Sequence, residues 1–360
     1  MVRLAERSGD GEAPRRLLAR NRPGEEQGAG AGGAEPRDRP GAVCLARHVV
    51  RPGCIAHQRR RLAEGAGRGA LEHREEVKDD SLAEGARSDV RAPDGTRLAV
   101  YEWGDPSGPE VVLIHGFAQS HLCFEPQLRS ELTRHCRVVA FDMRGHGASA
   151  QPSDAAAYQG GRVWADDIAT VLAAKGLERP VLVGWSMGGR IIRQYLMVYG
   201  DVRLGGVNFV ASQVIEEQQF RGPSAPRPLP EDLTLAGEIE AAIAFLDGCY
   251  GRKPSEAEFR RALGYNMKVP PSVRRAIGGW STDAAATRTA LAKVRVPVLV
   301  THGRADTVVL PAAAEAVAAS VPHARLSWFD GCGHSPFCED APRFNDELMA
   351  FVRSCAEAKR

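Results

Sequence analysis

A serine between two glycines carries the clearest chemical signal in the chain. Ser186 is the centre of Gly184-Trp185-Ser186-Met187-Gly188, which lies between an apolar run at 181–183 and a helical pattern that starts at Arg190. A serine on a sharp strand-to-helix turn has strained backbone angles, and glycines two positions away remove side chains that would collide with the strand or the helix. Such a turn presents the hydroxyl as a nucleophile for acyl transfer. A glycine-rich turn without a chemical role is the alternative interpretation.

The elements around this serine have the pattern of a parallel sheet covered by helices. From about residue 89, short β-rich runs alternate with helical patterns. Strands are expected at 97–103, 111–114, 137–141, 181–183, 204–210, 296–301 and 325–329, and helices at 164–172, after Ser186, at 312–320 and at 344–352. Residues 213–293 break this alternation with a Pro-rich stretch and short helical patterns. They predict a cap or lid over the strand ends, inserted into a core of residues 89–212 and 294–360.

Three segments in fixed order carry a resemblance to a known family. They are Leu113-Ile114-His115-Gly116-Phe117, then Phe141-Asp142-Met143-Arg144-Gly145-His146-Gly147-Ala148-Ser149, then the turn from Gly184 to Gly189. With them, residues 89–358 resemble the α/β-hydrolase superfamily, and within it bacterial esterases and cofactor-free haloperoxidase-like enzymes. The resemblance implies an α/β-hydrolase fold, in which a mostly parallel central sheet has helices on both faces and a helical cap insertion.

The resemblance also implies an acid after a late strand and a histidine after the last strand. Asp306 follows the strand expected at 296–301, and His334 follows the strand expected at 325–329. The intervening stretch accommodates one helix and one strand, so both side chains can return to the same edge of the sheet. The order Ser, Asp, His is the one that the family implies.

Each of these two assignments has a structural alternative. Asp306 could cap the helix that begins near Pro311, and His334 could be an ordinary loop histidine, although the glycines that flank it suit a tight loop presenting one side chain. Asp330 is a weaker candidate for the acid because it is close in sequence to the histidine. The strand that precedes the cap offers Asn208 and no carboxylate.

The loop after residue 114 is where the family builds half of its oxyanion hole. The resemblance implies the backbone N–H groups of Phe117 and Met187 as the two donors, and their side chains could shape the pocket walls. We expect His115 to bond loop backbone rather than to take part in the chemistry. The same interpretation, as a set that braces the loops, covers Asp142, Arg144 and His146.

Two tryptophans are candidates for the substrate pocket. Trp185 adjoins the nucleophile, where an aromatic residue serves either as core or as a platform for substrate. Trp280 lies in the cap beside Gly278 and Gly279.

The activity that these residues predict is hydrolysis of a small carboxylic ester through an acyl-enzyme. Ser186 attacks, His334 takes its proton, and Asp306 orients the imidazole, with no metal or organic cofactor. Perhydrolysis, carbon–carbon bond hydrolysis and acyl transfer on the same triad remain open, as does a receptor that binds a ligand with little turnover. A serine nucleophile disfavours epoxide hydrolysis and dehalogenation, which need a carboxylate.

Composition excludes several other classes. The net charge of +2 and the pI near 8.1 are too mild to indicate nucleic-acid binding. No run is long and apolar enough for a membrane span or a secretory signal, so a cytoplasmic location is expected. The 8 cysteines contain no CxxC pair and no zinc-finger spacing, which predicts reduced thiols and no metal site. The oligomeric state is left open.

The first segment, residues 1–88, differs from the rest. It is rich in Arg and Gly, with few aromatic residues and no sustained period, so it has little to bury. We expect either a disordered arm or residues translated upstream of the true start, for instance upstream of Val77. Intact-mass analysis of the natural protein distinguishes the two, because a chain that begins at Met1 or Val2 contradicts the second.

Overall fold

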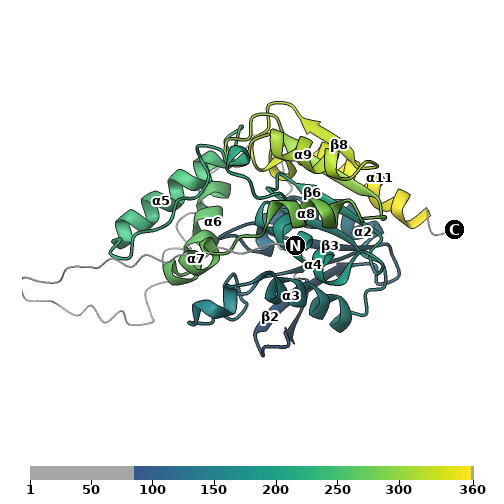
Figure 1. Ribbon diagram of the computed structural model, residues 1–360, viewed down its shortest axis with the longest axis horizontal. Coiled ribbons are helices and arrows are strands. Elements are labelled where there is room, and N and C mark those ends of the chain that lie inside the picture. Colours follow the sequence, from purple (N-terminus) through teal and green to yellow (C-terminus); the bar gives the residue numbers. More distant parts are fainter. Residues whose placement is uncertain (1–84, 358–360) are drawn as a thin grey trace, which may run out of the picture. The chain divides into compact units, whose positions relative to one another are not determined.

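The structure is a computed structural model, and it describes residues 85–357. One sheet of 8 strands has the order β1-β2-β4-β3-β5-β6-β7-β8 (Figure 1). The strands are β1 (Ala86–Arg91), β2 (Arg97–Gly104), β3 (Glu110–Ile114), β4 (Arg137–Phe141), β5 (Val181–Trp185), β6 (Gly206–Val210), β7 (Val298–Gly303) and β8 (Arg325–Phe329). The pairs β1–β2 and β2–β4 are antiparallel and all the others are parallel, which confirms the predicted mostly parallel sheet.

The first strand was not predicted from the sequence. It pairs Ala86 with Glu102 and Arg91 with Arg97, and it begins before the expected core boundary at residue 89. None of its side chains is fully buried, so it lacks the apolar run that marks the inner strands. Apart from its last few residues, the segment 1–88 lies outside the described part of the chain.

Helices cover both faces of the sheet, as predicted. The helices of residues 85–357 are α1 (Glu125–Leu128), α2 (Leu132–His135), α3 (Gly161–Ala174), α4 (Met187–Tyr199), α5 (Leu235–Gly248), α6 (Glu256–Met267), α7 (Pro271–Gly278), α8 (Ala284–Leu291), α9 (Ala312–Ser320), α10 (Pro336–Glu339) and α11 (Ala341–Glu357). Short 3₁₀ turns are η1 (His121–Phe124), η2 (Ala155–Tyr158) and η3 (Gln218–Phe220).

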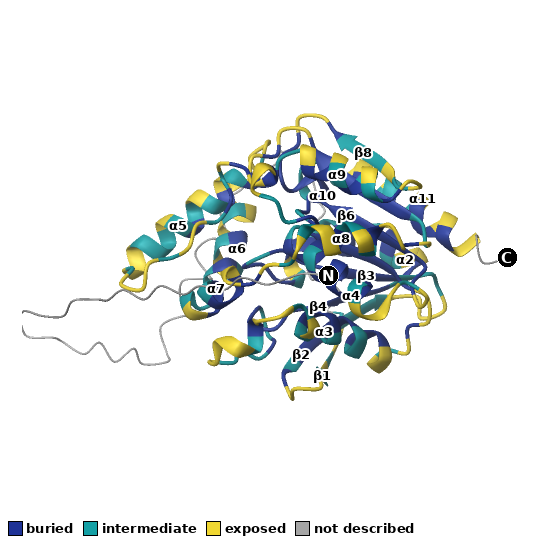
Figure 2. Ribbon diagram, viewed as in Figure 1, coloured by how far each residue is buried: buried dark blue, intermediate teal, exposed yellow. Residues whose placement is uncertain are grey.

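The core consists of one apolar layer on each face of the sheet. Along β3, Val112 and Ile114 join one layer, whereas Val111 and Leu113 join the other, because successive side chains of a strand point to opposite faces. The first layer is completed by α3, α4, α8 and α9, and the second by α1, α2 and α11. Figure 2 shows the resulting buried sheet, with exposed residues on the outer sides of the helices.

Residues 213–293, which we call the cap segment, contain η3 and the helices α5 to α8. Helices α5 and α6 pack on one another, and α5, α6 and α7 extend beyond the sheet on one side (Figure 1). The last helix differs, because α8 packs against α4 and α9 of the core. Within residues 85–357 no helix has the length and apolarity to cross a membrane.

Candidate active site

Ser186 occupies the junction between β5 and α4 in a strained conformation. Its backbone angles are φ 54° and ψ −115°, a region that costs a residue with a side chain roughly 1–3 kcal/mol. Two hydrogen bonds hold the turn: the Ser186 N–H donates to the Val210 carbonyl at 2.9 Å, and Ser212 Oγ donates to the Ser186 carbonyl at 2.6 Å. The sequence pattern contained no signal for Ser212, since it acts through the backbone.

The glycines on either side of the serine are required by close packing. A Cβ at Gly184 would lie 2.6 Å from the Gly188 carbonyl carbon. A Cβ at Gly188 would lie 2.2 Å from the Ile114 oxygen. Both distances are shorter than atoms tolerate, so the steric reason for the glycine spacing is confirmed. The loop after β3 lies directly against the turn, because a Cβ at Gly116 would be 3.2 Å from the Ser186 Cβ.

Asp306 and His334 are brought together in the interior. The His334 Nδ1 lies 2.8 Å from Asp306 Oδ2, and both side chains are fully buried. The other carboxylate oxygen accepts the N–H groups of Val308 and Val309 at 2.8 and 2.9 Å. These bonds hold the carboxylate in one orientation, with one oxygen facing the imidazole.

A second histidine supports the same carboxylate. The His302 Nε2 lies 3.1 Å from Asp306 Oδ2 and 2.9 Å from the Val309 carbonyl. Burial raises the pKa of Asp306, but the charge of His334 and the hydrogen bonds from His302 and His334 outweigh burial and leave that pKa well below its usual range. Asp306 is therefore ionised at neutral pH. Sequence reasoning missed His302, whose position four residues before the acid was the available signal.

The imidazole of His334 has one nitrogen free for chemistry. With Nδ1 directed at Asp306, its Nε2 is buried and has no hydrogen-bond partner among the described residues. The His334 carbonyl accepts a hydrogen bond of 2.8 Å from Trp185 Nε1. The residue before the serine therefore holds residues 330–335, the segment between β8 and α10 that we call the histidine loop. A buried, unpartnered ring nitrogen is suited to accept a proton from a hydroxyl group.

The two backbone groups expected to form an oxyanion hole belong to the residue after Ser186 and to the loop after β3. Met187 is the first residue of α4, where helical N–H groups have no partner in the preceding turn. Phe117 belongs to the loop that lies against Ser186. Among the hydrogen bonds of the described residues, none has the N–H of Phe117 or Met187 as its donor.

The histidines of the loop motifs are structural, as expected. His115 Nδ1 bonds the Gly116 carbonyl and its Nε2 accepts the Met143 N–H, at 2.8 and 3.0 Å. His146 repeats this pattern, since its Nδ1 bonds the Arg144 carbonyl and its Nε2 accepts the Ala118 N–H. Burial lowers the pKa of His115 to about 4 and that of His146 to about 3, which keeps both rings neutral.

The charged side chains of Arg144 and Asp142 also make structural contacts. Arg144 forms a two-point contact with Asp167, at 2.7 and 2.6 Å, and a third bond to Asp94. Asp142 accepts the N–H groups of His121 and Ala148 at 2.9 and 2.8 Å. The prediction that Asp142, Arg144 and His146 brace the loops is confirmed.

Both candidate pocket tryptophans have core contacts. Trp185 is 3% exposed and its ring lies 4.8 Å from that of Phe337. Trp280 is 4% exposed, stacks on Trp164 at 5.6 Å, and has the Arg190 guanidinium 4.8 Å from its ring centre. For both residues these contacts favour the core interpretation over a platform for substrate.

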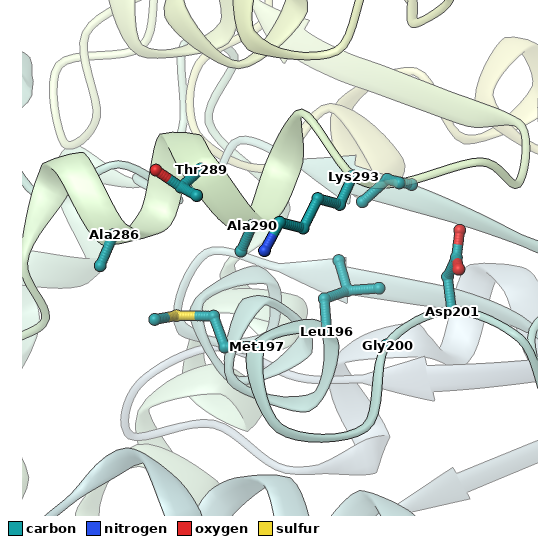
Figure 3. Close-up of a pocket in the computed structure, with 9 residues that line it drawn as sticks. Leu196, Met197, Gly200, Asp201, Ala286, Thr289, Ala290 and Lys293 are labelled. Carbon is teal, nitrogen blue, oxygen red and sulfur yellow. The ribbon is translucent and has the colours of Figure 1, made fainter.

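A surface pocket lies between the end of α4 and α8, away from these residues. It has a volume of about 330 Å³ and is lined among others by Leu196, Met197, Ala290 and Lys293 (Figure 3). Leu196 is ten helical residues beyond Ser186, which places it roughly 15 Å along the axis. None of the predicted site residues lines this pocket.

No metal site accompanies the buried pair. Within residues 85–357 no group of three or more His, Cys, Asp or Glu side chains is arranged to hold an ion, and the cysteines there are free thiols.

Comparison with known proteins identifies the family. A model of the alpha/beta hydrolase family matches residues 111–347. The chain belongs to the α/β-hydrolase family. Relatives of this α/β hydrolase include a non-heme chloroperoxidase from Streptomyces lividans, 29% identical over 280 residues, which are 74% of this chain and 99% of the relative. A bifunctional esterase/perhydrolase from Acinetobacter calcoaceticus is 27% identical over 278 residues, with the same two coverages.

Solved structures agree with this assignment. An esterase from Rhodococcus sp. is 31% identical, has a TM-score of 0.69, and covers 75% of this chain and 99% of its own. The family and these similar proteins make the chain an enzyme and support ester hydrolysis as its general class of reaction.

Proposed function

We propose that this α/β hydrolase cleaves small carboxylic esters through an acyl-enzyme formed on Ser186. The observation that supports the proposal most is the buried pair of Asp306 and His334, in which the ionised carboxylate orients the ring and leaves Nε2 without a partner. An imidazole in that tautomer can take a proton from a serine hydroxyl, and the carboxylate stabilises the imidazolium that results.

The proposed reaction has two steps. Ser186 Oγ attacks the acyl carbon while its proton passes to His334 Nε2, and the tetrahedral oxyanion is bound by the N–H groups of Phe117 and Met187. His334 then protonates the leaving alkoxide as the bond from carbon to the alkoxide oxygen breaks. In the second step the same nitrogen takes a proton from water, whose oxygen attacks the acyl-enzyme, and the proton returns to Ser186 Oγ.

Perhydrolysis is a second candidate activity at the same site. It is favoured by the names of two similar proteins, the chloroperoxidase and the esterase/perhydrolase. Hydrogen peroxide in place of water would attack the acyl-enzyme and release a peracid, which then oxidises halide in solution. The measurable sign is halide oxidation that depends on a carboxylic acid buffer.

The test of the proposed function is Ser186→Ala, assayed on a short aryl ester and with a fluorophosphonate probe. We expect activity to fall by several orders of magnitude and labelling to disappear. The control is Ser354→Ala, which removes a hydroxyl on α11 that bonds the Phe351 carbonyl and the neighbouring Cys355. Hydrolysis by Ser186→Ala at the wild-type rate contradicts the assignment. Labelling of the wild type without turnover of any ester would instead favour a ligand-binding receptor.

A further inference from the structure

Glu339, the last residue of α10, bonds the backbone on both sides of His334. Its carboxylate accepts the Gly333 N–H at 2.9 and 3.0 Å and the Ser335 N–H at 3.2 Å. The two donors are the residues directly before and after the histidine. The position of the imidazole along its loop therefore depends on this carboxylate, although Glu339 does not touch the ring. Sequence reasoning missed this residue.

The same carboxylate also bonds the cap segment. Oε2 of Glu339 accepts the N–H groups of Gly251 and Arg252, at 2.8 Å each, from the connection between α5 and α6. The Arg252 guanidinium adds a bond of 3.2 Å to the Asp330 carbonyl, at the start of the histidine loop. One side chain thus joins two segments that are about 85 residues apart in the sequence.

The two segments are in backbone contact beside Glu339. A Cβ at Gly251 would lie 2.7 Å from the Gly333 nitrogen, and a Cβ at Gly333 would lie 2.5 Å from the Gly251 nitrogen. On the other side, a Cβ at Gly303 would lie 2.1 Å from the Gly333 oxygen. The histidine loop is therefore held between the end of β7 and the cap segment, with no space for a side chain on either side.

The chemistry of the four donors requires a carboxylate. Two oxygens with negative charge accept four N–H groups, and hydrogen bonds to a charged acceptor are roughly twice as strong as neutral ones. A carboxamide has one acceptor oxygen, and its NH₂ group would face N–H groups in whichever orientation it takes. It would satisfy either the donors beside His334 or those of the cap segment.

We propose that Glu339 is a positioning residue that sets the place of His334 and couples it to the cap segment. Displacement of the connection between α5 and α6 would then move the proposed catalytic base. The inference rests on the proposed role of His334 in ester hydrolysis.

The first test is Glu339→Gln, measured on the aryl ester. Because a displacement of about 1 Å in a reacting group can cost on the order of 100-fold in rate, we expect kcat to fall roughly 10- to 100-fold while KM changes by less than about 3-fold. The rate of fluorophosphonate labelling should fall in parallel. The matched control is Glu347→Gln on α11, which removes a carboxylate that bonds Arg343 of the same helix and Ser327 of β8 and, within the described part of the chain, makes no hydrogen bond to residues 330–335.

The second test approaches the contact from the cap side. Gly251→Ala places a methyl group against Gly333 without changing Glu339 or the proposed triad, and the Gly251 backbone is not in the left-handed region that favours glycine. It should lower kcat in the same way, and the double variant Glu339→Gln with Gly251→Ala should be no slower than the slower single variant. Residues that act through one contact give such non-additive effects. If Glu339→Gln does not fold, the kcat of Gly251→Ala alone tests the proposed coupling.

The outcomes separate this proposal from the proposed function. Wild-type kcat in both single variants, or fully additive losses in the double variant, overturns the coupling even when Ser186→Ala is inactive. Activity retained in Ser186→Ala overturns the proposed function itself, whatever the Glu339 variants do.

Discussion

At the residue scale, different interactions hold Ser186 and Asp306 in their observed states. Ser186 has strained backbone angles, and hydrogen bonds to Val210 and Ser212 maintain them. Asp306 has no such strain but carries a charge in the interior, which two backbone N–H groups and two histidines compensate. Backbone strain fixes the direction of the proposed nucleophile, whereas compensated charge keeps the carboxylate of Asp306 ionised where burial alone would neutralise it.

Asp306→Asn tests the proposed tautomer of His334. The N–H groups of Val308 and Val309 will bind the amide oxygen, which turns the NH₂ group toward His334 Nδ1. The ring then carries its proton on Nε2 and cannot accept one, so we expect kcat to fall roughly 10³- to 10⁴-fold in an ester hydrolysis assay. The control is Asp330→Asn, an exposed carboxylate paired with Arg304, which should retain activity. An equal loss in both variants would contradict the role of Asp306.

At the element scale, the position of Ser186 depends on how closely α4 approaches β3. The first turn of α4 contacts the Ile114 carbonyl through Gly188, and Gly189 lies against the side chain of Ser212. Helix and strand meet at backbone distance here, so the turn between β5 and α4 has one geometry. The glycines of this turn therefore serve packing between elements as well as local conformation.

Two glycine substitutions separate close packing from helix propensity. Gly188→Ala brings a methyl group to 2.2 Å from the Ile114 oxygen, and we expect it to lower the free energy of unfolding by at least roughly 1–3 kcal/mol and to reduce activity. Gly264 lies inside α6, and nothing lies within 4 Å of the atom that Gly264→Ala adds. This substitution should raise the free energy of unfolding by roughly 0.5–1 kcal/mol. Urea denaturation measures both. A stable, active Gly188→Ala would be incompatible with this packing.

At the scale of the whole molecule, both ends of the cap segment bond to α4, the helix that begins directly after Ser186. Arg193 on α4 is fully buried and bonds Glu216 at the start of the segment and Thr282 near its end. Arg190 bonds Glu216 and the Trp280 carbonyl. Burial lowers the pKa of Arg193 to about 10, against the opposing charge of Glu216, so the guanidinium stays charged at neutral pH.

Glu216→Ala should destabilise the protein strongly. It leaves the buried Arg193 without a countercharge, and removal of one partner of a buried pair costs about 3–5 kcal/mol. The adjacent Glu217→Ala is the control, because Glu217 pairs with Arg288 nearer the surface, where solvent screens the pair and its loss should cost little stability. Urea unfolding of the two variants provides the comparison, and similar losses would argue against the anchoring role.

The stability of the molecule should also depend on pH through its loop histidines. The pKa values of His115 and His146 are lowered from 6.5 to about 4 and about 3, so between pH 4 and 6.5 the unfolded chain binds two protons that the folded chain does not. Stability then falls as pH falls through this window, by about 1.4 kcal/mol per pH unit for each histidine once the unfolded rings are protonated.

Denaturant unfolding at pH 7 and pH 5 measures this dependence. In His146→Gln the free energy of unfolding should differ less between pH 7 and pH 5 than in the wild type, because one titrating ring is removed. This expectation holds whatever the stability of the variant at pH 7. Equal wild-type stability at both pH values would contradict the buried neutral state of the two rings.

The sequence by itself was sufficient for features encoded over short distances. The runs that become β3 to β7 are apolar because both faces of the inner strands are covered, and the glycine spacing around Ser186 reflects a local steric need. The edge strand β1 was missed for the converse reason, since exposed positions need no apolar pattern.

Only the tertiary structure decided which distant residues meet. The bond between Asp306 and His334, the second histidine at Asp306, and the contact of Glu339 with the cap segment join residues from separate loops, and no periodic pattern encodes such pairs. The tryptophans illustrate the same limit. An aromatic residue beside Ser186 or in the cap segment has the same sequence signal whether it faces a pocket or the core, and for Trp185 and Trp280 the packing contacts favour the core.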